Sequence, residues 1–436
     1  MRADTPGDGG PRPAIGSSVS AFVPLWIAGL GFLWWPVVAG LETARGVRPA
    51  SRPVVVRLLR VLALVLTISL VANVLGGQVA LGRAAGSALA ILVWLSVAVV
   101  ITRWSGPGTR PSLVLGLGAI GALQGLLSGV AALLHPSPMS TLTTLAGQVA
   151  GSGLGDSGVA AWLSHDLAYD DFFGPDEIVR SAGMMASAAW SGGFAGLAAV
   201  ALAACARPVV RLLGGRWWLG AALLALNLVS VYLSYTRLTW VLTVLGLVAV
   251  AAAALARLVL GDRAHLALLP ALLLGAAIYV VAPPLDVQAL LTDADELRPD
   301  SSMARALSYT LGIDMTTGGD VPTQLFGFGA KPTVASLPYG VGSESTYVSL
   351  LVRGGTIALL VFVAALGAAF WVCLRRADWV GGLLLVLLAA HAVVEDLDVG
   401  TLTPLVLVAV LAAPARPVAE ASGRGTRDGR PRVGVP

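Results

Sequence analysis

Long uncharged apolar runs dominate this sequence and most restrict what it can fold into. Several stretches of about 18 residues or more carry no charged side chain, and a helix of that length crosses about 30 Å of hydrocarbon. The whole chain is 56% hydrophobic and only 12% charged, whereas soluble domains carry about 25% charged residues. The chain is therefore predicted to be an all-α, polytopic membrane protein.

About 11 transmembrane helices (about 10–12) are predicted, within a single transmembrane domain over residues 19–414. The expected spans are Val19–Leu41, Leu58–Gly76, Ala84–Thr102, Ser112–Leu134, Ala182–Cys205, Trp217–Tyr235, Leu238–Ala256, Ala264–Pro283, Tyr347–Cys373, Trp379–Leu397 and Val399–Pro414. Residues 1–18 are polar and rich in glycine and proline, and no signal-peptide cleavage site is evident after the first apolar run. Residues 1–18 and the Arg/Gly/Pro-rich tail 415–436 are predicted to be disordered.

The placement of arginine predicts the orientation. If residues 45–60 lie in the cytoplasm, alternation along the spans puts most of the 28 lysines and arginines on the cytoplasmic side, as the positive-inside rule requires. The N-terminus is then outside and the C-terminal tail cytoplasmic. Two long hydrophilic segments, residues 135–181 and 284–346, become external loops, and loops of such length are often functional.

Some partners and cofactors are not indicated. No basic stripe with interleaved aromatic residues occurs, so nucleic acid is not an expected partner, whereas membrane lipids are. The two cysteines, Cys205 and Cys373, fall near expected cytoplasmic helix ends and suggest neither a disulfide nor a metal site. His165, Asp166, Asp170 and Asp171 are loosely spaced, and a solvated loop explains them better than a metal. No cofactor is predicted.

Four external arginines lie beside expected membrane helices: Arg180, Arg237, Arg305 and Arg353. Arg353 is about two turns into a span, where a buried charge usually signals a partner or a function. Guanidinium groups offer a rigid fork of donors suited to phosphate oxygens. Together these residues favour a site for a lipid diphosphate, although snorkelling or ion pairs at helix ends would also account for each one.

Glu344 is the candidate general base, in the segment Gly342-Ser343-Glu344-Ser345-Thr346-Tyr347. A carboxylate at a helix start can deprotonate an acceptor hydroxyl if desolvation raises its pKa. It can equally be an acid that interacts favourably with the helix dipole. Lys331, Ser343 and Tyr347 are candidate contacts to phosphate or sugar.

Other residues in and near this segment are given less specific roles. Gly327 and Gly329 are expected to serve turns rather than phosphate binding, and a short helix is expected around Met303–Ile313. His391 and Glu395 share a helix face and are followed by Asp396 and Asp398. These residues either line the external cavity or end the span as solvated acids.

Three stretches in chain order resemble the O-antigen ligase/polymerase family of membrane glycan transferases. Arg180-Ser181-Ala182-Gly183 resembles its Arg-x-x-Gly, and Thr236-Arg237-Leu238-Thr239-Trp240 resembles its Ser/Thr-Arg-x-x-Trp helix start. Phe326-Gly327-Phe328-Gly329, then residues 342–347 and Gly354-Gly355, resemble its Gly-x-Gly … His-Asn/Ser-x-Tyr … Gly pattern. The resemblance covers roughly residues 177–370, and Glu344 stands where the family commonly has histidine.

The resemblance implies a metal-independent transferase with a fold like that of C-type membrane glycosyltransferases. It would move an oligosaccharide from an undecaprenyl-diphosphate carrier to a hydroxyl of a glycan or lipid acceptor, outside the cytoplasmic membrane. Glu344 and Arg305 would be catalytic, Arg180 and Arg237 would hold the donor, and Arg353 would support them. Attachment or polymerisation of an envelope polysaccharide is the expected outcome.

Two alternatives remain open. A transporter or flippase for lipid-linked sugars would be expected to show broken helices in paired halves, and no internal repeat is seen. The other interpretation is a non-catalytic envelope-assembly protein. The main argument for it is that Glu344 stands where the family commonly has histidine. Convergence of Arg180, Arg237, Arg305 and Glu344 on one outer cavity would favour the enzyme.

Overall fold

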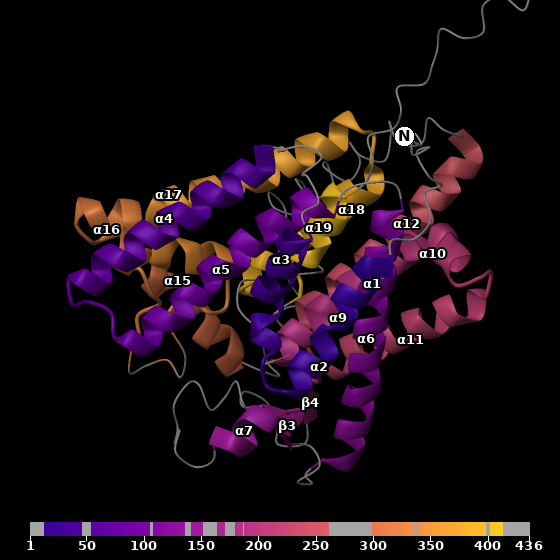
Figure 1. The fold of residues 1–436 in the computed structure, drawn as a ribbon, viewed down its shortest axis with the longest axis horizontal. Helices are drawn as coiled ribbons and strands as arrows, with labels where there is room; N and C mark the ends of the chain where they lie inside the picture. The colour runs from indigo at the N-terminus through magenta and orange to yellow at the C-terminus, as the bar shows by residue number, and fades with distance from the viewer. Residues whose placement is uncertain are drawn as a thin grey trace, which may run out of the picture.

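The computed structural model describes residues 13–45, 54–104, 108–135, 141–150, 164–170, 179–185, 187–260, 299–334, 337, 340–397 and 402–412. Within these ranges the chain is a bundle of helices with two short antiparallel sheets (Figure 1). The helices before the sheets are α1 (Pro13–Ser20), α2 (Phe22–Ile27), the 3-10 turn η1 (Gly31–Leu33), α3 (Trp34–Ala44), α4 (Val54–Leu75), α5 (Leu81–Arg103) and α6 (Thr109–Leu134). Then come β1 (Thr141–Thr143), α7 (Leu145–Ala150), β2 (Ser164–Asp166), β3 (Ala168–Asp170) and β4 (Val179–Ser181). The later helices are α9 (Ala188–Ala204), α10 (Ala206–Leu212), α11 (Trp217–Leu233), α12 (Arg237–Leu260), α15 (Pro299–Thr317), α16 (Val321–Phe326), α17 (Thr346–Arg375), α18 (Trp379–Val394) and α19 (Leu405–Leu411).

Five of the described helices are long and apolar enough to cross a membrane: α4, α5, α6, α12 and α17. A sixth span results if α9 and α10, which are bent by 87° at Cys205, count as one. These helices bear out an all-α, multi-pass membrane protein. They do not reproduce the eleven expected spans: α11 and α18 are shorter apolar helices of 17 and 16 residues, and Ala264–Pro283 lies outside the described residues.

The first expected span, Val19–Leu41, is wrong, because this segment is a hairpin. In one continuous helix Ser18 and Glu42 would be about 36 Å apart, yet the Ser18 hydroxyl donates to Glu42 Oε1 at 3.4 Å. The Trp34 indole also donates to the Ser18 carbonyl. Pro13 therefore lies at the same end of the bundle as Arg45, opposite to the expected N-terminal side, and residues 13–18 are helical rather than disordered.

Helix α17 also folds back on itself. Its backbone leaves the helical conformation at Gly355, with φ 68° and ψ −169°, and a side chain there would collide with the Leu325 carbonyl. A continuous helix would separate Tyr347 from Phe362 by about 22 Å, but their ring centroids are 5.6 Å apart. The result is a buried short arm, residues 346–354, packed beside a long arm, residues 356–375, which at about 30 Å can cross a membrane alone.

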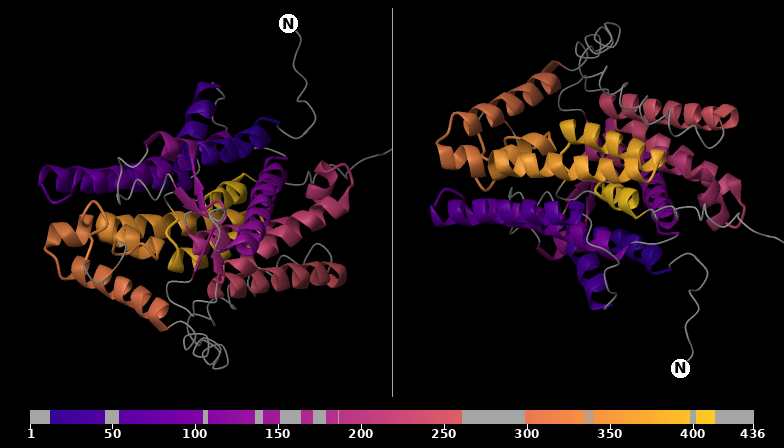
Figure 2. Two further views of the ribbon diagram at one scale, coloured as in Figure 1. Left: turned by 90° about the horizontal axis from the view of Figure 1, so that it is seen from below. Right: turned by 90° about the horizontal axis from the view of Figure 1, so that it is seen from above.

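The last expected span, Val399–Pro414, is not a span either. Helix α19 has seven residues, all buried, and is only about 10 Å long. In Figures 1 and 2 it lies inside the bundle, among α5, α6 and α18. It acts as part of the core, not as a crossing helix.

Helices α6 and α11 pack closely against each other, and small residues allow it. Gly121 and Gly125 face α11, where a Cβ would collide with the Asn227 side chain and the Leu226 carbonyl. Asn227 donates across the interface to the Gly118 carbonyl at 2.9 Å. Glycines four apart with interhelical hydrogen bonds are typical of helix pairs in membranes, so this pair forms a firm frame for the loops.

Contacts between the termini of neighbouring helices define two opposite ends of the bundle. At the arginine-rich end, Arg110 of α6 contacts Asp378 before α18, and Arg376 donates to the Leu411 carbonyl of α19. At the loop end, the start of α17 contacts Glu395 beyond α18, and Asn73 of α4 contacts Gly327. These groupings agree with the predicted alternation, in which the loop end is external.

Candidate functional site

The segment predicted as the large loop 284–346 contains two helices in its described part. The helix expected around Met303–Ile313 is confirmed and is longer, α15 (Pro299–Thr317). Helix α16 follows, with Asp320 accepting from the Thr323 amide as its N-cap, a preferred capping arrangement. The other expected loop, 135–181, contributes the sheets β1–β2 and β3–β4. Both segments are thus partly folded against the bundle.

The turn after α16 is built by glycine, as predicted. Gly327 (φ 69°) and Gly329 (φ 74°) have left-handed backbones, which side chains disfavour. A Cβ on Gly327 would lie 2.5 Å from the Val352 carbonyl oxygen. The Phe328 and Gly329 amides donate to the Val352 and Arg353 carbonyls at 2.7 and 3.0 Å. This turn thereby holds the last carbonyls of the short arm and fixes Lys331 close to it.

Arg305 and Glu344, the two candidate catalytic residues, are paired. Arg305 Nη2 lies 3.5 Å from Glu344 Oε2, and the side chains are 32% and 28% exposed. Glu344 immediately precedes Ser345, the N-cap of α17, so the expected position at a helix start is confirmed. The hydroxyl of Tyr309, one turn along α15, lies within hydrogen-bond distance of the carbonyls of Val393 (2.7 Å) and Glu344 (3.1 Å), which holds the turn before α17 against α15.

Lys331 and Arg353 meet at one buried carboxylate, Asp396. The Lys331 ammonium contacts Asp396 Oδ2, and Arg353 Nη2 lies 3.5 Å from the same oxygen. Arg353 also donates to the Ser349 hydroxyl at 2.5 Å. Its side chain is 4% exposed, and it belongs to the short arm rather than to a spanning helix. Arg353 therefore stabilises the Asp396 carboxylate that Lys331 contacts, from the buried side of this pair.

Glu395 completes this set of charges. It is buried, its carboxylate packs on Gly193 of α9, and Oε1 has no hydrogen-bond partner among the described residues. Burial raises the pKa of Glu395 well above its ordinary value; Arg305 acts to lower it and Glu344 to raise it. These six residues are called the charge cluster below: Arg305, Lys331, Glu344, Arg353, Glu395 and Asp396.

The charge cluster favours an anion when Glu395 is protonated. Burial favours the neutral form of a carboxyl, which leaves three cations against the carboxylates of Glu344 and Asp396. Burial also lowers the pKa of Lys331, while Asp396 beside it acts in the opposite direction. Lys331, with a side chain 23% exposed, Arg305 and Glu344 remain accessible. Incoming phosphate oxygens would add compensation that the protein itself does not supply.

The remaining residues of the 342–347 segment have structural contacts. The Tyr347 hydroxyl donates to the Ala389 carbonyl of α18 at 3.0 Å, so this side chain joins the short arm to α18. Ser343 is half-buried in the turn beside Glu344. The Thr346 amide and hydroxyl donate to the Glu395 carbonyl. Thus the arm is tied to the end of α18 on the side where the charge cluster forms.

Arg180 and Arg237 lie at a different place, the turn between α11 and α12. Arg180 is in strand β4, not at the start of a span, and donates to the Ser234 carbonyl and the Thr236 hydroxyl. Arg237 is the first residue of α12, as expected for a hairpin tip. In the nearby motif, Trp240 donates to the Val231 carbonyl and stacks on Tyr232.

Helix α9 nonetheless brings the two places close. Gly192 packs against Ser234, in the α11–α12 turn, and its neighbour Gly193 packs against Glu395 in the charge cluster. Successive residues of a helix are about 1.5 Å apart along its axis, so both contacts lie at one level of the bundle. Of the four residues expected to converge, the structure pairs Arg305 with Glu344, whereas Arg180 contacts the separate turn between α11 and α12, where Arg237 begins α12.

Asp396 and Glu395 are the members whose role the sequence left open. Neither ends α18 as a solvated acid, because they are 1% and 2% exposed. The sequence contained a signal for this pairing. Arg353 lies in an apolar helix and therefore needs a buried acidic partner, and acidic residues follow directly at the end of the next expected span. Within the described ranges, no group of three or more His, Cys, Asp and Glu is arranged to hold a metal.

Comparison of the chain with protein-family models, with curated proteins and with solved structures gives no match.

Proposed function

We propose that the protein is an envelope glycan transferase, similar to O-antigen ligases and polymerases, that moves an oligosaccharide from a polyprenyl-diphosphate carrier to an acceptor hydroxyl. The observation that carries the proposal is the Arg305–Glu344 pair, 3.5 Å apart and about one-third exposed, beside the accessible Lys331. An acid and two cations at the loop end of a membrane bundle suit a charged lipid donor. The proposed setting is the outer face of the cytoplasmic membrane.

The chemistry needs one base and a stabilised leaving group. In the proposed step the acceptor oxygen attacks the anomeric carbon, a glycosidic C–O bond forms, and the C–O bond to the diphosphate breaks. Glu344 accepts the hydroxyl proton as general base. Arg305 and Lys331 stabilise the negative charge that develops on the leaving diphosphate. Asp396 and Arg353 keep Lys331 in place, and Arg180 and Arg237 serve more distant parts of the donor.

A transporter of lipid-linked sugars is a second candidate, and the broken helices favour it. The fold-back at Gly355 and the 87° bend between α9 and α10 interrupt the helices in the way that transporter sites do. Against it, the accessible charges gather at the loop end and no paired repeat is seen in the sequence. The same experiment separates the two functions.

The test compares native-host strains that carry Glu344→Gln, Arg305→Gln or the wild-type protein at matched abundance. Lipid-linked oligosaccharides are extracted and set against the mature surface glycan. A transferase predicts short lipid-linked units that accumulate on the outer leaflet while long or attached glycan disappears. Accumulation on the inner leaflet, measured with a membrane-impermeant sugar-oxidising label, would support the transporter instead. Unchanged glycan in both variants would remove the catalytic assignment.

A further inference from the structure

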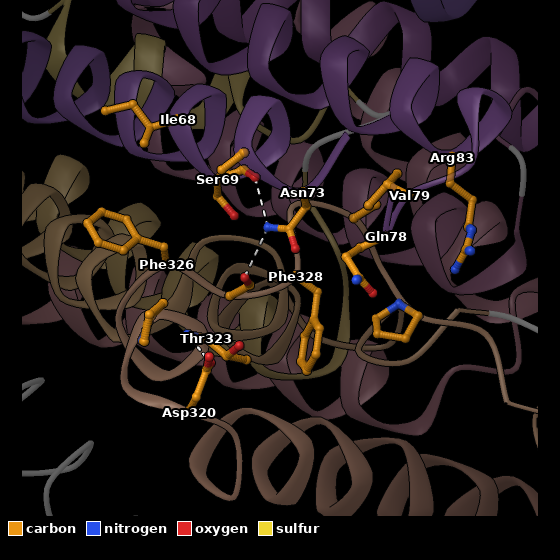
Figure 3. Close-up of a pocket in the computed structure, with 15 residues that line it drawn as sticks. Ile68, Ser69, Asn73, Gln78, Val79, Arg83, Asp320, Thr323, Phe326 and Phe328 are labelled. Atoms are coloured by element: carbon orange, nitrogen blue, oxygen red, sulfur yellow. Dashed lines mark hydrogen bonds between the residues drawn. The ribbon is translucent and has the colours of Figure 1, made fainter. Parts of the chain in front are cut away.

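A pocket lies at the loop end, separate from the charge cluster. It has a volume of about 610 Å³ and lies between the last turns of α4, the turn into α5, helix α16 and the glycine turn 326–332 (Figure 3). This volume is within the range of pockets that bind small molecules, about 300–1,000 Å³. None of the roles derived above uses it.

The walls of this pocket combine aromatic rings with side chains that can donate and accept hydrogen bonds. Phe326 and Phe328 line one side, and Asn73, Gln78 and Arg83 project from the other side, as Figure 3 shows. Asn73 is held in place because its amide nitrogen donates to the carbonyls of Ser69 and Gly327 at 2.9 and 3.3 Å. Its oxygen is thereby left as an acceptor for a ligand.

The charge on the walls is balanced. Among the described residues, its charged side chains are Asp320 and Arg83, one acid and one base. A phosphate would gain from Arg83 but would be repelled by Asp320, and a hydrocarbon chain would leave the amide and charged groups without partners. A neutral sugar satisfies both kinds of group, because its hydroxyls donate and accept and its C–H faces pack on aromatic rings.

One turn separates the pocket from the charge cluster. Ala330 and Pro332 line the pocket, while Lys331 between them reaches Asp396 in the charge cluster. The same turn is bonded to the Val352 and Arg353 carbonyls of the short arm. A ligand in the pocket would therefore lie directly behind the group that is proposed to bind the donor diphosphate.

We propose that this pocket binds a neutral sugar unit of an oligosaccharide and so acts as a glycan subsite of the transferase. The assignment deepens the proposed function and rests on it for the origin of the glycan. The sugar stacks on Phe326 and Phe328 and hydrogen-bonds to Asn73, Gln78, Arg83 and Asp320. Occupation of the pocket orients the glycan chain relative to the glycine turn.

The direct test fills the pocket. Ala72 lines it and is exposed on α4, so Ala72→Trp puts a bulky ring into the cavity without removing a buried contact. Val71, which is 49% exposed and is not in the pocket lining, provides the matched control Val71→Trp. The probe is a set of neutral oligosaccharides released by mild acid from the host's own surface glycan. Their binding to purified protein in nanodiscs is measured by saturation-transfer NMR and calorimetry.

We expect binding to Val71→Trp equal to that of the wild type, and binding at least about tenfold weaker to Ala72→Trp, since the cavity is occupied. Phe328→Leu should weaken binding by a smaller factor. Equal binding to Ala72→Trp and Val71→Trp would overturn the subsite, as would wild-type protein that binds none of the oligosaccharides.

Failure of the subsite and failure of the proposed function give different results. If the protein is a transferase without this subsite, Glu344→Gln abolishes surface glycan while Ala72→Trp leaves its amount and length unchanged. If the protein is not a transferase, Glu344→Gln leaves glycan intact, and Ala72→Trp still weakens oligosaccharide binding. If both hold, Ala72→Trp shortens or reduces the glycan and Val71→Trp does not.

Discussion

The two ends of the bundle each enclose charged side chains, but in the described part of the chain the hydrogen bonds of these side chains are completed at one end and left incomplete at the other. At the arginine-rich end, Arg110 makes a bidentate pair with Asp378 and donates to the Ala409 and Val410 carbonyls. Asp378 in turn accepts from the Gly381 amide and caps α18. At the loop end, by contrast, Arg305 Nε, Glu395 Oε1 and Asp396 Oδ1 make no hydrogen bond within the described residues.

This difference separates a scaffold from a site. A buried pair whose donors and acceptors are all used holds helices together and has nothing left to offer a ligand. Buried polar groups are normally hydrogen-bonded, so the exceptions call for a reason. In the charge cluster one donor, the Arg305 Nε–H, and two acceptor oxygens, on Glu395 and Asp396, remain unused within the described ranges, and Arg305 is the partly exposed side chain among the three.

Removal of Arg110 is the strongest test of the scaffold half of the comparison. Arg110→Met leaves Asp378, whose side chain is 12% exposed, without its cation and two carbonyls of α19 without donors. Loss of one partner of a buried pair typically costs about 3–5 kcal/mol. We expect a markedly lower unfolding temperature in detergent and little folded protein in the membrane. A variant as stable as the wild type would show that this pair is not structural.

Removal of Lys331 should cost less, because Arg353 remains beside Asp396. Lys331→Met is expected to lower the free energy of unfolding by about 1–3 kcal/mol and to reduce glycan transfer further than the stability loss explains. Lys331→Arg, which keeps the charge, is the matched control and should recover most of the stability. The measurement pairs thermal unfolding with glycan yield per folded molecule.

The buried carboxyl Glu395 predicts a pH-dependent effect. Because burial raises its pKa in the folded state, the stability it contributes is present at low pH and is lost as pH rises from its ordinary value of 4.5 toward the raised value. The slope in that window is about 1.4 kcal/mol per pH unit. Glu395→Gln should remove this decline, which begins as pH rises above 4.5. Asp314→Asn, an exposed change on α15, should keep it; identical pH profiles for Glu395→Gln and the wild type would contradict the assignment.

The smallest stability effect is expected at Arg305. Its pair with Glu344 is long and about one-third exposed, and such pairs contribute about 0–1 kcal/mol. Arg305→Gln should therefore unfold within about 1 kcal/mol of the wild type, although glycan transfer falls. A large loss of stability would show that the Arg305–Glu344 pair is structural, like the Arg110–Asp378 pair.

Much of the frame could be predicted from the sequence, because uncharged runs of sufficient length leave few options. The spans that became α4, α5, α6 and α12 were expected within a few residues. The hairpin of residues 13–45 and the fold-back at Gly355 were missed, because hydropathy does not distinguish one long helix from two antiparallel arms. The local signals were glycines: Gly29, with φ 81°, and the pair Gly354-Gly355.

The candidate site was partly predictable for a related reason. Arg305, Lys331, Glu344 and Arg353 stood out because charge is rare in this chain, and the structure brings them together in pairs. The link through Asp396 could not be read from the sequence, because it depends on how the short arm meets the end of α18. Arg180 and Arg237 belong to the same set of family-like motifs as these residues, but they lie outside the charge cluster. Their turn packs against Gly192 of α9, whereas Glu395 of the charge cluster packs against Gly193.

The most direct test of the account is transfer by purified Glu344→Gln protein in liposomes, with lipid-linked oligosaccharide from the host as donor and its surface glycan as acceptor. We expect an unfolding temperature like that of the wild type and transfer lowered about 100-fold or more, because a general base is lost. Transfer at the wild-type rate by a correctly folded Glu344→Gln protein would contradict it.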